Sequence, residues 1–172
     1  MKTLLAAAAT SLLLATGHAW AQTPNDAQIA SIVVTANQVD IDAGNLAESK
    51  ASSPEVKAFG KQMVTDHSGV NKQAVALVTK LKVTPEDNAT SKSLKEGGEK
   101  NVAALKGLEG AAFDRAYVAH EVEYHVAVLG VIDTVLVPNA KNAELKALLL
   151  KVRPAIDAHL QHARRLATSL GK

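Results

Sequence analysis

The chain has 172 residues, of which 47% are hydrophobic and only 3% aromatic, and its 19 basic side chains nearly balance its 17 acidic ones. This length allows one domain with a sizeable core, and a core so poor in rings favours helices packed through Ala, Leu and Val over a β-sandwich. The composition argues against disorder and against a dedicated nucleic-acid binder, and the lack of cysteine excludes disulfides, thiolate metal sites and a cysteine nucleophile.

The first residues have the three parts of a secretory signal peptide. Met1-Lys2-Thr3 is a short positive start, Leu4 to Ala15 is an apolar stretch too short to span a bilayer, and Ala19-Trp20-Ala21 is a small-x-small cleavage site. We therefore expect a signal peptide over residues 1–21 and a mature domain over residues 22–172. No second long apolar segment follows, so the prediction is export to the bacterial periplasm without integral membrane insertion.

Four long helices are predicted in the mature chain, because apolar residues recur there at helical spacing. The ranges are about Asn25–Lys50, Pro54–Lys82, Ala112–Leu136 and Asn142–Leu170. The polar stretch Glu86–Gly110, interrupted by Gly97-Gly98, is expected to be a crossover that contains one or two short helices. Two tight hairpins joined by one long crossover predict an all-α fold of the ferritin-like four-helix bundle type.

Each predicted helix places at least one metal-ligand type of side chain on its apolar face, at about 100° of rotation per residue. Asp40 lies in the middle of the first stripe and His67 in the middle of the second, whereas the third face carries Glu121 with His125 at its edge. His159 lies within the fourth stripe. A buried aspartate needs a partner, so Asp40 is expected to pair with a base or to bind a metal, whereas each histidine alone is more often a hydrogen-bonded core residue.

The joint pattern indicates a metal site, since a helical interior that holds carboxylates and several imidazoles suits a divalent transition metal such as Zn, Fe, Ni or Cu. Only two carboxylates face inward and no Glu-x-x-His pair occurs, which favours a mononuclear, histidine-dominated site over a di-iron site. The segment from His120 to His125 has one residue too many for the metalloprotease motif H-E-x-x-H. The candidate ligands are Asp40, His67, Glu121, His125 and His159.

Several neighbouring polar residues are expected to have lesser roles. His120 and His162 are expected at the rim of the bundle or in solvent. Asp66 is expected near the helix border, as a surface group or as a group behind a ligand. If the protein is an enzyme, Tyr117 or Tyr124 would lie near the metal.

Segments along nearly the whole mature chain resemble a bacterial family of exported ferritin-like proteins that has a domain-of-unknown-function label and is often described as outer-membrane proteins. The resembling segments are Gly44-x-Leu46-Ala47, Val56-Lys57-x-Phe59-x-x-x-Met63-Val64-x-Asp66-His67, Phe113-Asp114-x-x-Tyr117 with His125, and His159-Leu160. The resemblance implies a ferritin-like bundle whose polar pattern includes an inward acid with His67, His125 and His159. Family members often have Glu where this chain has Asp40, so the carboxylate here is one methylene shorter.

Two functions remain open from the sequence. The first is a periplasmic metal-binding bundle that serves in metal storage, buffering or stress-related redox chemistry. The second is a non-catalytic structural or interaction protein whose inward histidines and acids form a hydrogen-bonded core network that fixes the helix register.

Overall fold

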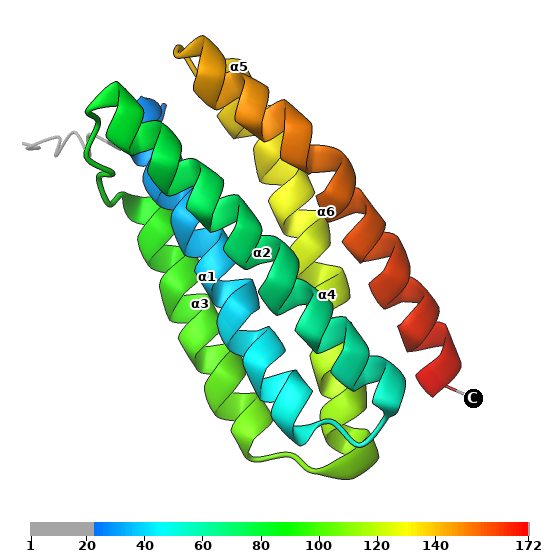
Figure 1. Cartoon of the computed structure of the whole chain (residues 1–172). Helices are drawn as coiled ribbons and strands as arrows, with labels where there is room; N and C mark the ends of the chain where they lie inside the picture. Colours follow the sequence, from blue (N-terminus) through cyan, green and yellow to red (C-terminus); the bar gives the residue numbers. More distant parts are fainter. Residues whose placement is uncertain (1–22, 172) are drawn as a thin grey trace, which may run out of the picture.

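The computed structural model describes residues 23–171, and all the regular secondary structure in that range is helical (Figure 1). This confirms the all-α prediction, while the predicted signal peptide lies outside the described residues. The elements in chain order are α1 (Asp26–Lys50), α2 (Pro54–Leu81), α3 (Ala89–Lys106), α4 (Gly110–Val131), the π-helical turn η1 (Ile132–Leu136), the short α5 (Val137–Asn139) and α6 (Ala143–Leu170).

Helices α1, α2 and α6 begin at side chains that satisfy the free amides of a first helical turn, whereas the residue before α4, Glu109, makes no such bond. Asn25 accepts from the Gln28 amide at 2.9 Å, and the Gln28 side chain accepts in return from the Asn25 amide at 3.1 Å. Ser53 caps α2 just before Pro54, and the Asn142 side chain accepts from two amides of α6. These local signals are the reason that the predicted helix starts lie close to the observed ones.

The crossover between α2 and α4 was expected to contain one or two short helices. It instead forms one helix of 18 residues, α3. Asn88 caps its start through the amides of Thr90 and Ser91. The glycine pair does not break the helix. A Cβ added at Gly98 would lie only 2.6 Å from Cγ2 of Val39, so this glycine lets α3 pack directly against α1.

The third predicted helix also has more detail than expected, since its last part is not regular α-helix. Residues 132–136 form the π-helical turn η1, and the three residues of α5 follow before the chain enters α6. Such turns insert an extra residue into a helical ladder.

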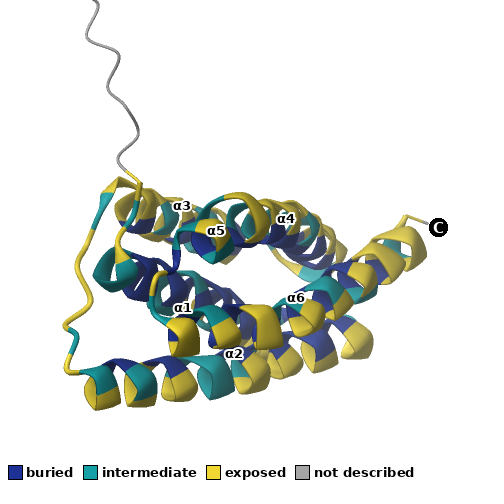
Figure 2. Ribbon diagram, turned by 90° about the horizontal axis from the view of Figure 1, so that it is seen from above, coloured by how far each residue is buried: buried dark blue, intermediate teal, exposed yellow. Residues whose placement is uncertain are grey.

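The helices lie side by side, with α1 and α2 paired, α4 and α6 paired, and α3 along the outer side of α1 (Figure 1). Buried residues line the inner faces of these helices (Figure 2). The most extensive contact joins α1 to α2, where a Cβ added at Gly44 would lie 2.8 Å from the carbonyl oxygen of Gly60. Within residues 23–171, no helix combines the length and apolar character needed to cross a membrane.

The apolar core consists of two clusters that meet near the middle of the long helices. One cluster includes Ile32 and Leu149, and the other includes Phe59 and Phe113. Along α1 the two clusters are separated by Asp40, and the other three inner helices have their buried histidines and glutamate at the corresponding place. The fold therefore places a polar layer between two apolar ones.

Candidate metal centre

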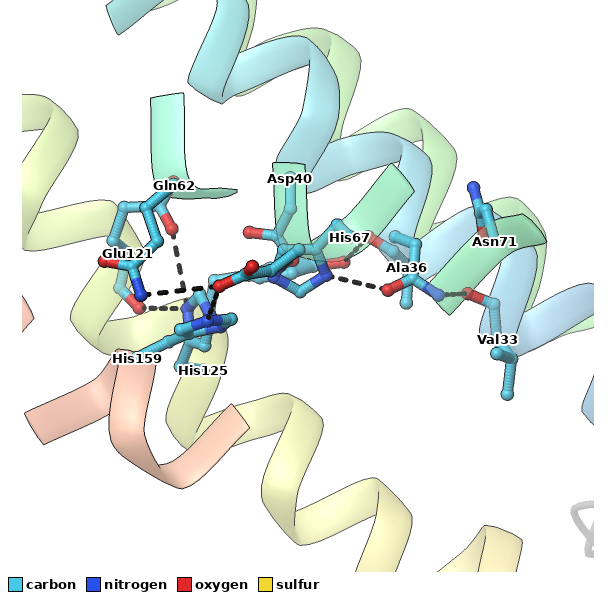
Figure 3. Close-up of polar contacts among 12 residues, drawn as sticks. Val33, Ala36, Asp40, Gln62, His67, Asn71, Glu121, His125 and His159 are labelled. Atoms are coloured by element: carbon cyan, nitrogen blue, oxygen red, sulfur yellow. Dashed lines mark hydrogen bonds and ion pairs between the residues drawn. The ribbon is translucent and has the colours of Figure 1, made fainter. Parts of the chain in front are cut away.

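The polar layer is a single buried cluster to which four helices contribute (Figure 3). None of its five members is more than 3% exposed. They are Asp40 from α1, His67 from α2, Glu121 and His125 from α4, and His159 from α6. The structure therefore brings together all five residues that the sequence indicated.

Two overlapping groups of ligand-type atoms lie within this cluster. One ring nitrogen from each of His67, His125 and His159 lies within 4.8 Å of the other two, and the three ring centroids are 5.2–5.8 Å apart. In the second group, one atom from each of Asp40, Glu121 and His125 meets the same limit. His125 thus belongs to both groups and joins a nitrogen-rich side to a carboxylate side.

A fixed acceptor sets the tautomer of His67. The Asn37 amide nitrogen donates to the Val33 carbonyl at 2.8 Å, so the Asn37 Oδ1 atom faces the ring, 2.7 Å from His67 Nδ1. Because this oxygen only accepts, Nδ1 carries the proton and Nε2 keeps its lone pair. That Nε2 atom is buried and has no hydrogen-bond partner.

The other two imidazoles have the same arrangement. His125 Nδ1 lies 2.9 Å from the backbone carbonyl of Glu121, which can only accept, and His159 Nε2 donates to Asp66 Oδ2 at 2.9 Å. The opposite nitrogens, Nε2 of His125 and Nδ1 of His159, are buried without a partner. Each ring is therefore oriented through one nitrogen while its other nitrogen remains free, which is the usual state of a metal-ligating histidine.

The carboxyl groups of the cluster also have unpartnered atoms. Both carboxyl oxygens of Glu121 and the Oδ1 atom of Asp40 are buried without a hydrogen bond. The nearest contacts between acid and imidazole are 3.5 Å, from His67 Nε2 to Asp40 Oδ2 and from His125 Nδ1 to Glu121 Oε2. These contacts are longer than normal hydrogen bonds. Unpaired buried polar atoms are unfavourable, so six of them in one place call for a physical explanation.

Burial sets the charge state of the cluster. It raises the pKa of Asp40 well above its ordinary value, helped by the neighbouring Glu121 charge, and it raises the pKa of Glu121 to about 8. Burial also lowers the pKa of His67 well below its ordinary value, with the neighbouring imidazoles adding to this, and lowers the pKa of His125 to about 4. Without a cation, these two imidazoles are therefore predominantly uncharged at neutral pH, and burial disfavours the ionised form of both acids.

Asp66, His120 and His162 lie outside the buried cluster, as their positions on the predicted helices suggested. Asp66 is exposed on α2 and orients His159 from outside the cluster. His120 and His162 are only partly buried, and His162 contacts the ring of Phe59 and the side chain of Gln62.

The two tyrosines differ in their surroundings. Tyr117 is fully buried, its hydroxyl has no hydrogen-bond partner, and burial together with the charges of Glu121 and Asp40 raises its pKa well above the ordinary value. Tyr124 instead donates to the Ala36 carbonyl at 3.0 Å. Tyr117 is therefore the tyrosine whose hydroxyl lies at the carboxylate side of the cluster, next to Glu121.

Sequence reasoning missed Asn37, which is buried and holds His67 in its tautomer. Its position gave a signal, because it lies four residues after Val33 and three before Asp40 on the same helix face. It also missed the structural role of Asp114, whose carboxylate accepts from the backbone amides of Ser52 and Ser53 at 2.9 and 2.8 Å. This contact fixes the α1–α2 turn against α4.

Together, the helices and the cluster define an all-helical protein with a buried His/carboxylate layer. A family model matches residues 13–166, so the chain belongs to the family described as domain of unknown function DUF4142. No curated protein and no solved structure matches the chain.

Proposed function

We propose that this protein is an exported, ferritin-like four-helix bundle, formed by α1, α2, α4 and α6, that binds a divalent transition metal ion in its polar layer. The proposed ligands are His67, His125 and His159, completed by Glu121 and Asp40. Storage or buffering of the ion requires nothing beyond these residues. A stress-related redox role would require iron or copper as the ion.

One observation carries this proposal. Three imidazoles from three helices each donate one N–H, to the Asn37 side chain, the Glu121 backbone carbonyl or the Asp66 carboxylate, and the other nitrogen of each ring is buried and unpaired. The three rings lie close together, with centroids 5.2–5.8 Å apart. A cation would satisfy all three lone pairs at once and would also stabilise the ionised form of the acids. The candidate ligand atoms lie within 4.8 Å of one another. To bind one ion at metal–nitrogen distances of about 2.0–2.1 Å, they would have to move closer together by about 1 Å.

The donor set limits the kind of metal. Neutral imidazole with carboxylate oxygen suits Zn, Fe, Ni and Cu(II), whereas Ca and Mg prefer oxygen ligands alone. Soft Cu(I) prefers thiolate or thioether, and the chain has no cysteine and two methionines. Met63 is the methionine near this layer, and it packs within the apolar cluster.

The second candidate function is a core hydrogen-bond network without a metal. Such a network is expected to pair its buried polar atoms at normal distances. Here the outer nitrogens have acceptors at 2.7–2.9 Å, but the inner nitrogens, Nε2 of His67, Nε2 of His125 and Nδ1 of His159, have no hydrogen-bond partner. This difference between outer and inner contacts favours the metal-binding proposal.

The test is elemental analysis of tag-free protein purified from the periplasm of cells grown with ample metal. We expect about one equivalent of a transition metal per chain, and a rise in melting temperature when Zn, Fe, Ni or Cu is added to chelator-treated protein. Sub-stoichiometric metal together with an unchanged melting temperature for all four ions would refute the proposal.

Variants then separate ligation from stability. His67→Ala and His159→Ala should each abolish metal binding, even when measured under conditions where the variant is folded. His162→Ala is the matched control, since this histidine lies on α6 one turn from His159 but outside the cluster. Variants that lose stability and still bind one equivalent would support the network function instead.

Export is part of the same proposal and has its own measurement. The apolar stretch Leu4 to Ala15 and the site Ala19-Trp20-Ala21 support cleavage after residue 21. Cell fractionation followed by intact-mass measurement should find the mature chain beginning at Gln22 in the periplasmic fraction. Recovery of the full-length chain in the cytoplasm alone would contradict this part.

A further inference from the structure

An apolar cavity of about 80 Å³ lies beside the polar layer, inside the helices that form it. Fourteen of its seventeen lining residues are apolar, so its wall offers almost no hydrogen bonds. The largest contributions come from α1, α4 and α6, with residues such as Ile32, Val33, Val128, Leu149, Val152 and Ile156. These residues lie in or against the apolar cluster that contains Ile32 and Leu149.

The three polar lining residues are Asn37, Asp40 and His67, so one end of the cavity lies at the polar layer. The Asn37 amide is already engaged, with its nitrogen on the Val33 carbonyl and its oxygen on His67. The free polar atoms at this end are therefore Asp40 Oδ1 and His67 Nε2. Two polar atoms at one end leave the remainder of the cavity apolar.

A cavity of this kind is a poor place for water, which needs two to four polar partners, and apolar cavities of roughly 150 Å³ stay dry and bind benzene or xenon. The present cavity has about half that volume, so it suits a smaller guest. We infer that the cavity is a binding site for a small, uncharged, apolar molecule of a few heavy atoms, held by Val, Leu and Ile side chains with one end against His67 and Asp40.

One wall of the cavity lies near the surface of the protein. One lining residue, Ala127 of α4, is exposed, and its neighbour Val128 is only partly buried. The wall of the cavity beside α4 therefore borders solvent. In this arrangement an apolar molecule reaches the polar layer from within the core, whereas the Asp66 side of the cluster faces water.

The test uses xenon on the full mature chain after chelator treatment, so that its result does not depend on whether a metal binds. We expect saturable xenon-induced shifts in NMR spectra of the methyl groups, largest for Val33, Val152 and Ile156 and absent from the cluster around Phe59 and Phe113. Shifts that rise linearly with xenon pressure and are scattered over exposed methyl groups would overturn the inference.

Two variants with opposite effects complete the test. Ala36→Leu adds three carbons to a partly buried lining residue and should remove the saturable shifts, whereas Ala76→Leu at an exposed position of α2 is the matched control and should retain them. Leu149→Ala enlarges the cavity and should give tighter xenon binding and new binding of benzene. If Ala36→Leu does not fold, Leu149→Ala decides the question. Unchanged xenon binding in Leu149→Ala would overturn the inference.

Discussion

Replacing Glu121 by Gln should stabilise the metal-free protein, and the gain should grow with pH. The carboxyl is fully buried, and burial raises its pKa from 4.5 to about 8. Between these values the unfolded chain has lost the Glu121 proton while the folded chain retains it, so the stability of the native protein falls as pH rises. Glutamine has nearly the same shape and does not ionise, so the variant avoids this loss.

The size of the effect follows from the width of this pH window. From pH 4.5 to pH 7 is about 2.5 pH units, and each unit corresponds to about 1.4 kcal/mol, which gives a gain of about 3 kcal/mol at pH 7. Below about pH 4.5 the gain should vanish, because both states then hold the proton. Removal of Glu121 also removes one cause of the raised pKa of Asp40, which acts in the same direction.

The assay is urea unfolding of both proteins in chelator at several pH values from 4 to 8, with the free energy of unfolding compared at each pH. Glu123→Gln, at an exposed position of the same helix, is the control and should show no such pH-dependent gain. A difference between Glu121→Gln and the natural protein that stays constant with pH, or that shrinks as pH rises, would refute the reasoning. Added metal should reverse the ranking, since glutamine is a weaker ligand than carboxylate.

Five further variants test the fold and the orientation of the cluster. Asp114→Ala should lower the free energy of unfolding by roughly 2–3 kcal/mol in urea melts, because it removes a buried acceptor of two backbone amides, whereas Asp133→Ala in the exposed ion pair with Arg153 should lower it much less. Gly97→Ala should raise the melting temperature, since nothing lies within 4 Å of the added Cβ, while Gly98→Ala should lower it through the clash with α1. Asn37→Ala should weaken metal binding about 10–100-fold in a chelator competition assay, and an unchanged affinity would exclude the orienting role of this side chain.

Much of the fold was predictable because its signals are local. Ser53-Pro54 fixes the start of α2. The distance of a residue from this turn along α1 or α2 then follows from its position in the sequence. Asp40 lies ten residues before the end of α1 at Lys50, about 15 Å along the axis, and His67 lies thirteen residues after Pro54, about 20 Å. Since the two helices run in opposite directions, these side chains fall at nearly the same level, and periodicity turns both inward.

The features that sequence reasoning missed depend on contacts between distant segments. A Gly-Gly pair normally weakens a helix, but in α3 the absence of a side chain at Gly98 is what allows contact with Val39, which lies 59 residues away in the chain. Asn37 looks like an ordinary polar residue until His67 is placed 2.7 Å from its oxygen. The free nitrogens of the imidazoles are equally invisible in sequence, because each depends on the partner of the opposite nitrogen.

The position of the polar layer explains why it is unfavourable without a ligand and still uniquely placed. It interrupts an otherwise continuous apolar interior, and apolar residues of similar volume at these positions would generally be as stabilising or more so. The surrounding structure nevertheless holds the rings in single orientations through Asn37, Asp66 and the Glu121 carbonyl. All of these hydrogen bonds hold the outer nitrogens. The inner atoms, three ring nitrogens and three carboxyl oxygens, are buried without hydrogen-bond partners. The proposed cation would meet both the lone pairs and the acids, so bound metal is the property to measure first.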